Sequence, residues 1–348
     1  MTDGIAVTDE IGAAVREVLG SIEVHGPDGA WSEPAERAAC VQLADGGWLG
    51  VGLPEQLGGS GGDLRDAAAV AGACAAAGHR LPAADAGIVA AHVLELSGLR
   101  APAGLVLPVP AAGTLRDGRV QLHVPRVPFA RWAATLLIVA DHGSGHQACL
   151  VDAGAADISA GHNLAGEPRD TVVVDGVRPL AAADVGGHVH DQLQRAGALA
   201  RAIQIAAAIE RMLELAIGYC GQRSQFGRTL SQFQAVQQQL ALLAGEALAA
   251  RGAVQRALAL VAPQPGPGDW AVEPVAVAKV RTGLAATAAT RIAHQLHGAI
   301  GITTEYPLHR FTTPAWSWRD EYGSDGHWSA TLAAAYPGDL WPALAAAD

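Results

Sequence analysis

The chain has 348 residues, half of them apolar and 16% charged, with one lysine against 22 arginines and a formal net charge of −11. This length favours about two to three domains, and the negative charge argues against general nucleic-acid binding, which needs a basic surface. The four cysteines are far apart and form no CxxC pair, so we expect reduced thiols and no zinc site.

Two kinds of targeting segment are also missing from the sequence. No run of about 18 apolar residues is present, so we predict no membrane span. The opening stretch MTDGIAVTDE is acidic and lacks the basic and apolar regions of a signal peptide. These features predict a cytoplasmic protein.

The first part of the chain, residues 1–104, is predicted to be a helical domain. The segments 10–22 and 36–50 carry apolar residues spaced by three and four, which is typical of one helix face. The glycine-rich turn PEQLGGSGGD (54–63) then interrupts the helical pattern. A further helix is expected to start there, with Asp63 as its N-cap.

The middle part, residues 105–185, is predicted to be a β-domain. Short β-branched runs separated by Gly, Asp and Pro are typical of strands. They occupy segments 105–110, 119–124, 135–140, 148–153 and 171–176. Their regular spacing favours a small β-barrel or sandwich.

The last part, residues 186–348, is predicted to be a four-helix bundle, because the helical period returns near His190. Helices are expected over 190–222, 230–261, 271–297 and 327–336, with a loop at APQPGPGDW (262–270). The fold class is therefore α+β and mostly α, in the order helices, strands, helices.

The stretch RSQFGRTLSQFQAVQ, Arg223 to Gln237, separates two long predicted helices. Phe226 and Gly227 are a helix-breaking pair, and glycine lets the backbone turn where a side chain would block an approaching ligand. Taken alone, an Arg- and Gln-rich turn of this kind is also compatible with a plain solvated connection between two helices.

Three stretches resemble motifs of the acyl-CoA dehydrogenase family. The turn 54–63 resembles PEEYGGxG, the stretch 223–237 resembles RxQFGxxLxxFQxxQ, and AHQLHGAIGITTEYPLHR (293–310) resembles QxxGGxGxxxExPLxR. Their order and spacing agree with the family over nearly the whole chain. The resemblance implies an FAD enzyme that desaturates the α,β-bond of an acyl-CoA thioester and passes electrons to an acceptor protein.

The resemblance further implies that FAD lies across a subunit interface in a tetramer. Arginine suits a pyrophosphate because its planar fork matches phosphate oxygens. Arg223 matches the family's pyrophosphate arginine and Phe226 its adenine-side aromatic, while Ala299 replaces a usual glycine. The complete set of expected FAD contacts is Arg223, Gln225, Phe226, Gly227, Gln234, Gln295 and Gly298.

The catalytic base of the family has no clear counterpart. Most members place a glutamate before a glycine after the ExPLxR segment, and this chain has Tyr322 there; a tyrosine with a pKa of about 10 is a poor base. A few members place it 26 residues ahead of the RxQFG arginine, where this chain has Gly197. Glu321 is a fallback base, displaced by one residue.

The β-region departs from the family as well. The stretches LPVPAAGTLRDG (107–118) and PRVPFARWAA (125–134) lack most of the hydroxyl and amide donors that the family aims at the flavin ring. The chain therefore resembles the non-catalytic subunit of heteromeric α2β2 acyl-CoA dehydrogenases of actinobacterial steroid side-chain degradation. A partner subunit would then supply the base and the flavin pocket.

Two other readings stay open. One is a self-sufficient homotetramer with Glu321 as base, and the other is a scaffold or binding subunit without flavin. Two histidine pairs, His188 with His190 and His294 with His297, could also indicate a metal, but a site needs three or four ligands. Because no acidic or thiol partners cluster near either pair, we predict no metal.

Overall fold

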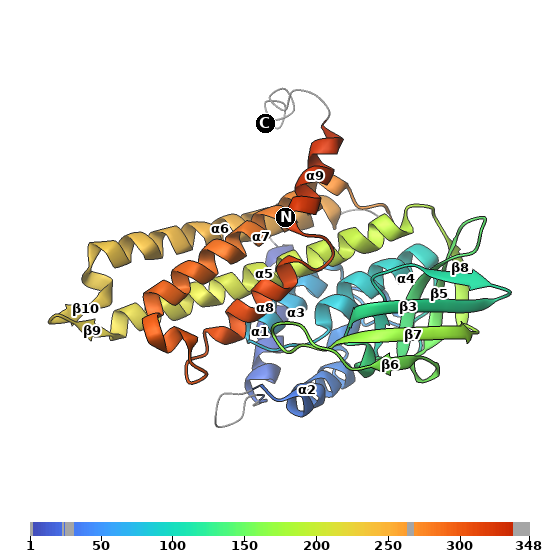
Figure 1. Ribbon diagram of the computed structural model, residues 1–348, viewed down its shortest axis with the longest axis horizontal. Coiled ribbons are helices and arrows are strands. Elements are labelled where there is room, and N and C mark those ends of the chain that lie inside the picture. Colours follow the sequence, from blue (N-terminus) through green and yellow to red (C-terminus); the bar gives the residue numbers. More distant parts are fainter. Residues whose placement is uncertain (1–2, 23, 25–30, 263–267, 337–348) are drawn as a thin grey trace.

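The computed structural model describes residues 3–22, 24, 31–262 and 268–336, with side chains from residue 10 onward. The predicted loop 262–270 lies partly outside these residues. Long helices α5, α6 and α7 run along the molecule, with a sheet at one end and a small hairpin, β9–β10, at the other (Figure 1). The mostly helical α+β class predicted from the sequence is confirmed.

Helices make up the N-terminal part. They are α1 (Asp3–Gly20), α2 (Glu33–Asp45), α3 (Leu64–Ala76), a π-helical turn η3 (Asp85–Ala90) and α4 (Ala91–Ser97), which continues from it. The predicted N-cap Asp63 is confirmed, because its carboxylate accepts from the backbone N–H groups of Arg65 and Asp66. Asp66 in turn accepts from the Asp63 N–H, which completes a capping box.

The middle part is one eight-stranded sheet. Its strands are β1 (Val106–Pro108), β2 (Gly113–Arg116), β3 (Arg119–Pro128), β4 (Thr135–Asp141), β5 (His146–Asp152), β6 (Asp157–Ser159), β7 (Arg169–Val177) and β8 (Ala181–Val185). They pair in the order β6-β7-β3-β2-β4-β5-β8, and β1 pairs with β4 in parallel. The β5–β8 pairing places the end of the sheet beside the start of α5.

The C-terminal part is a bundle built around α5. Its helices are α5 (Val189–Gln222), α6 (Gln234–Val261), α7 (Val272–His297), α8 (His309–Arg319) and α9 (Asp325–Ala335). Alanine, leucine and isoleucine of α5 are buried against α3, α6, α7 and α8 in the largest hydrophobic cluster. Whether the three parts are separate domains with the predicted boundaries stays a prediction.

Some predicted elements differ from the structure. The predicted helix start at 230 was wrong, because residues 230–232 form a 3₁₀ turn and Phe233 is extended. Helix α8 was missed, since Pro314 and neighbouring threonines lower its helical propensity; burial of Phe311 and Trp318 stabilises it instead. Strands β2, β6 and β8 were missed because they are short or alanine-rich.

Among the described residues, no helix combines the length and the apolar character that crossing a membrane requires. The four cysteines are free and buried.

Candidate functional site

The segment between α5 and α6 folds as a β-hairpin with a two-residue turn. Strands β9 (Ser224–Gln225) and β10 (Arg228–Thr229) pair antiparallel, and the turn residues Phe226 and Gly227 have φ of 52° and 78°. Two consecutive positive φ angles are typical of a type I′ turn, whose twist matches that of the strands it joins. Gly227 meets this requirement without strain, whereas Phe226 does not.

The side chains of this hairpin point outward. Phe226 is 91% exposed, and Arg223, Gln225 and Gln234 are exposed as well. Within the described part of the chain, no hydrogen bond or ion pair involves the Arg223 guanidinium. The hairpin therefore presents the Arg223 cation and most of the Phe226 ring to solvent, and the Phe226 ring also meets Phe233 edge to face at a centroid distance of 6.4 Å.

The second predicted group of FAD residues lies at the C-terminal end of α7. Gln295 and Gly298 are exposed, and a Cβ added at Gly298 would meet no atom within 4 Å. The His297 ring stacks on Tyr219 of α5 at a centroid distance of 4.8 Å. This contact brings the end of α7 to the end of α5 that carries the hairpin, so the structure gathers both predicted groups at one end of the bundle.

The two positions of the family base lie elsewhere, with Gly197 far along α5 and Tyr322 between α8 and α9. Gly197 precedes Arg223 by 26 residues on one continuous helical stretch, which corresponds to about 39 Å at 1.5 Å per residue. The hairpin and the base positions of one chain therefore belong to different sites.

Tyr322 and Gly197 are in direct contact. A Cβ added at Gly197 would lie 2.1 Å from Cδ1 of Tyr322, so the ring occupies the space that any side chain at 197 would need. Tyr322 is buried with φ of 53°, and its hydroxyl donates to Asp85 Oδ1 at 3.4 Å. Burial raises the pKa of the Tyr322 phenol, with a further contribution from the Asp85 carboxylate. The residue is therefore a neutral group that fills the centre.

A buried ion network surrounds this tyrosine. Arg201, on the α5 turn after Gly197, donates to Asp85 Oδ1 at 2.8 Å and to Glu321 Oε2 at 2.7 Å. The Arg201 side chain is 1% exposed, and its guanidinium carbon lies 5.3 Å from the centroid of the Tyr322 ring. Each charge in this network has an opposite partner, as buried charges require.

Arg169 of β7 extends the network into the sheet. It donates to both oxygens of Glu321, at 2.7 and 3.0 Å, and to Glu167 at 3.0 Å. Burial alone would raise the pKa of Glu321, but the charges of Arg169 and Arg201 dominate and lower it to about 2. A carboxylate held this way is a weak proton acceptor.

Sequence reasoning missed Asp85, Arg201 and Arg169. Asp85 and Arg201 each stand alone among apolar residues, in PAADAGIVAA and GALARAIQIA. Charged residues are almost never fully buried unless they are paired. A lone charge of each sign within two apolar runs was therefore an available signal for a buried ion pair.

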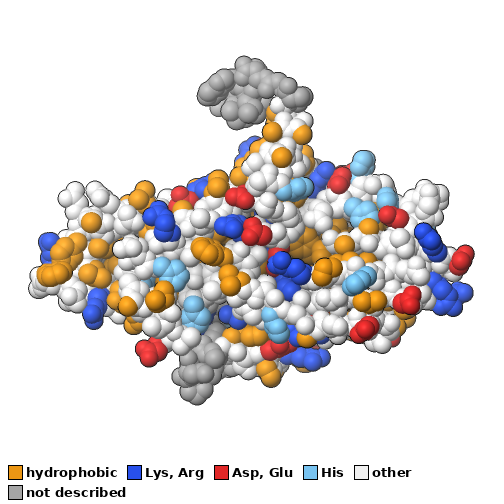
Figure 2. Space-filling model, in the orientation of Figure 1, with side chains coloured by type: hydrophobic (Ala, Val, Ile, Leu, Met, Phe, Trp, Pro, Cys, Tyr) orange, Lys and Arg blue, Asp and Glu red, His pale blue; other side chains and the backbone are white. Residues whose placement is uncertain are grey.

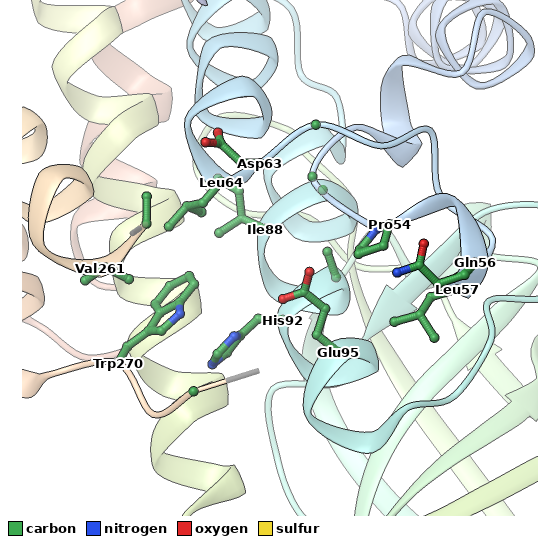
Figure 3. Close-up of a pocket in the computed structure, with 16 residues that line it drawn as sticks. Pro54, Gln56, Leu57, Asp63, Leu64, Ile88, His92, Glu95, Val261 and Trp270 are labelled. Carbon is green, nitrogen blue, oxygen red and sulfur yellow. The ribbon is translucent and has the colours of Figure 1, made fainter. Parts of the chain in front are cut away.

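The PEQLGG turn lines a separate pocket of about 330 Å³. Figure 3 shows Pro54 and Leu57 of this turn on one side, His92 and Glu95 of α4 at the centre, and Trp270 opposite. The His92 ring lies 4.2 Å from that of Trp270 and contacts Gln192 at 3.2 Å. Burial lowers the pKa of His92 to about 4, so this imidazole is neutral at pH 7.

The two histidine pairs have different surroundings. The expectation that no acidic partner lies near His188 and His190 was wrong, because the fold brings Asp141 and His146 to His190. His294 instead contacts Thr312 at 3.2 Å, and His297 contacts the Ala293 carbonyl at 2.7 Å.

Comparison with known sequences points to one family. Residues 191–325 match the family described as acyl-CoA dehydrogenase, C-terminal domain. Acyl-CoA dehydrogenase FadE27 of Mycobacterium tuberculosis is 29% identical over 308 residues, which cover 79% of this chain and 82% of that protein.

Solved structures of similar fold agree with this match. A chain of the ChsE4-ChsE5 complex from Mycobacterium tuberculosis has a TM-score of 0.80 at 21% identity, over 95% of this chain and 97% of that one. An acyl-CoA dehydrogenase from Bacillus anthracis, complexed with FAD, has a TM-score of 0.79 at 16% identity, over 95% of this chain and 66% of that one. These likenesses show the fold.

Proposed function

Because the chain belongs to the acyl-CoA dehydrogenase family, we propose that it is the subunit of a heteromeric, FAD-dependent acyl-CoA dehydrogenase that does not carry the catalytic base. A partner subunit of the same fold holds the isoalloxazine ring and the acyl-CoA thioester. This chain completes the FAD site with its hairpin and the end of α7. The assembly is a tetramer that passes electrons to an acceptor protein.

One observation carries the proposal: the family's two base positions are occupied by Tyr322 and Gly197, and the tyrosine ring fills the space between them. No carboxylate stands at either position. The nearest buried carboxylates, Asp85 and Glu321, are held by arginines. Removal of the proton α to the thioester carbonyl needs a free base within hydrogen-bond reach, so the base belongs to another chain.

The exposed hairpin fits one end of FAD. Arg223 offers donors that have no side-chain partner among the described residues, and Phe226 offers a ring face for an adenine. Gly227 and Gly298 leave open space where a side chain would stand. FAD, when bound between the subunits, supplies the hydride acceptor for the β-carbon.

The rival in which Glu321 is the base meets a physical obstacle. Both carboxylate oxygens accept from Arg169 and one also accepts from Arg201. A pKa near 2 leaves Glu321 ionised at neutral pH but reduces its affinity for a proton far below that of an ordinary carboxylate. The Brønsted relation therefore disfavours this role.

Flavin content separates the three readings. The chain is purified alone and co-expressed with a second acyl-CoA dehydrogenase-like subunit that has an intact glutamate, and bound FAD is measured by absorbance after denaturation. We expect flavin only in the co-purified complex. Yellow, active protein from this chain alone would favour the homotetramer, and a colourless complex would favour the flavin-free scaffold.

Turnover of the complex tests the base directly. We expect Glu321→Gln to leave flavin reduction by a panel of acyl-CoA thioesters, steroid side-chain thioesters included, within a few-fold of wild type. Loss of a positioned base would instead lower turnover by about 10²–10⁴. Asp320→Asn is the matched control, since Asp320 is exposed and adjacent. A collapse confined to Glu321→Gln, with flavin still bound, would contradict the proposal.

A further inference from the structure

A cluster of metal-ligating side chains lies where the sheet meets α5. Asp141 ends β4 and His146 begins β5, and the two face each other as a cross-strand pair. His146 also pairs with Val185 at the end of β8, directly before the chain enters α5. His190 is the second residue of α5, so three separate elements bring these side chains together.

The ligand atoms of the cluster are close to one another. His146 Nδ1 lies 2.5 Å from Asp141 Oδ1, and His190 Nε2 lies 3.3 Å from the same oxygen. One ligand atom from each residue can be chosen so that all three lie within 4.8 Å of one another. The two imidazole rings meet edge to face at 5.0 Å. Three donors this close to one another can reach a single ion once it displaces the direct contact between His146 and Asp141.

We propose that Asp141, His146 and His190 bind a divalent transition-metal ion of the Zn²⁺ type. Two imidazole nitrogens and one carboxylate oxygen are ligands that zinc takes at about 2.0–2.2 Å, with a fourth position left for water. The side chains are 25–49% exposed, so an ion can enter and keep a water ligand. The ion replaces the protons through which the two rings now contact the carboxylate.

The charge around the cluster favours a cation. The Asp141 carboxylate lies 3.3 Å from His190 Nε2 in the first turn of α5, where its negative charge offsets the partial positive charge of the helix N-terminus. In Figure 2, histidine side chains lie beside acidic ones over the end of the molecule where α5 meets the sheet.

A metal at this position would tie the sheet to the helical bundle. The chain passes from β8 to α5 through residues 186–188, which include two glycines. Binding to the folded chain alone stabilises it by mass action. This site is independent of the acyl-CoA chemistry, since none of its residues belongs to the hairpin or to the Tyr322 network.

Titration of the chain with ZnCl₂ by calorimetry, after treatment with a chelator, tests the proposal. We expect one equivalent to bind to the wild type. His146→Ala and His190→Ala should each weaken binding at least about tenfold, because loss of an outer-shell contact alone costs 10–100-fold. His188→Ala is the matched control, since it removes the other histidine of the same HxH stretch and should bind as wild type.

Asp141→Asn keeps the size of the side chain and should also lower the affinity, with circular dichroism confirming an unchanged fold. Substitution of Co²⁺ gives a second readout, in which visible absorption bands of a tetrahedral site appear in the wild type and are lost in His190→Ala. Absence of stoichiometric zinc binding in the wild type would overturn the proposal. Equal binding by the wild type and both histidine variants would do so too.

Discussion

Two arginines of the same helical stretch have opposite surroundings. Arg201, in the middle of α5, is fully buried and bonds to Asp85 and Glu321. Arg223 follows the last residue of α5, is exposed, and has no side-chain partner among the described residues. Arg201 lies one helical turn after Gly197, where some members of the family place their glutamate. Arg223 begins the stretch 223–237, which is the motif that resembles the family most fully.

The difference shows how charge is used in the two regions. Around Tyr322, the carboxylates of Asp85 and Glu321 are held by Arg201 and Arg169, so neither is free to bind or deprotonate a substrate. At the hairpin, the Arg223 charge and most of the Phe226 ring face solvent, and Phe226 keeps a positive φ with only an edge-to-face contact to Phe233 among the described rings. We call the Tyr322 region with its buried ion network the closed centre, and the exposed 223–227 hairpin the open end. A subunit that completes a site held by its partner needs both features.

The largest expected effect comes from a substitution that disrupts the buried ion network of the closed centre. Arg201→Ala should lower the free energy of unfolding by about 3–5 kcal/mol, because it leaves the buried Asp85 carboxylate without the arginine that pairs with it and removes one of the two arginines that hold Glu321. The measurement is chemical denaturation of the chain. Arg211→Ala on the same helix is the control, since the Arg211–Glu214 pair is exposed and worth about 0–1 kcal/mol.

Equal costs for these two arginines would contradict the buried network. Arg201→Met adds a further comparison, since an apolar side chain of similar length restores packing but not charge. We expect it to stay well below wild-type stability, because the two carboxylates remain buried.

The next effect is a dependence of stability on pH. The folded pKa of Glu321 is about 2, below its ordinary value of 4.5. Its contribution, on the order of 3 kcal/mol, is therefore fully present above pH 4.5 and lost progressively as the pH falls toward 2. Denaturation at pH 6 and pH 3 measures this loss. In Glu321→Gln the loss between the two pH values should be smaller than in the wild type; an identical slope would contradict the assignment.

Much of the fold was predictable because its signals are local. The periodicity of α5 and α7, the strands rich in valine, and the Asp63 cap all follow from nearest neighbours in sequence. Helix α8 was not predictable in this way, since Pro314 opposes it locally and long-range burial of Trp318 decides the outcome.

The candidate site also has one part that local sequence predicts and one part that it does not. The motif 223–237 was visible because its residues are contiguous, although their roles toward FAD stay a prediction. The network of Asp85, Arg169 and Glu321 includes bonds that span 152 positions, from Arg169 to Glu321, and 237 positions, from Asp85 to Tyr322. Only the packing of α5, β7 and the segment after α8 brings them together, so sequence spacing gave no direct sign of it. The same holds for Asp141, which meets His190 from 49 positions away.

A smaller effect is expected from a substitution in the open end, at Arg223. In the complex with its partner, Arg223→Ala should weaken FAD retention by roughly ten- to hundredfold, which corresponds to about 1.5–3 kcal/mol for a charge-assisted contact. The stability of the isolated chain should not change, since the Arg223 guanidinium bonds to none of the residues that the structure describes. Arg251→Ala serves as control, since Arg251 of α6 is exposed and forms an exposed ion pair with Glu210. Unchanged FAD retention in Arg223→Ala would remove this residue from the site.

The smallest expected effect comes from Phe226→Asn. This change affects FAD binding in the complex and the stability of the isolated chain in different ways, so it tests the contrast between the two regions directly. Asparagine adopts positive φ more readily than phenylalanine does, and Asn-Gly is the preferred sequence of a type I′ turn. Phe226→Asn should therefore leave the isolated chain equally stable or slightly more stable in chemical denaturation. In the complex, loss of a ring that stacks on adenine should weaken FAD binding by about 1 kcal/mol, or roughly fivefold. Phe226→Tyr keeps the ring and should bind FAD as the wild type does. A contrary result would be that Phe226→Asn lowers the stability of the isolated chain and leaves FAD affinity unchanged. The Phe226 ring would then stabilise the hairpin and would not bind FAD, and the contrast between the open end and the closed centre would fail at this residue.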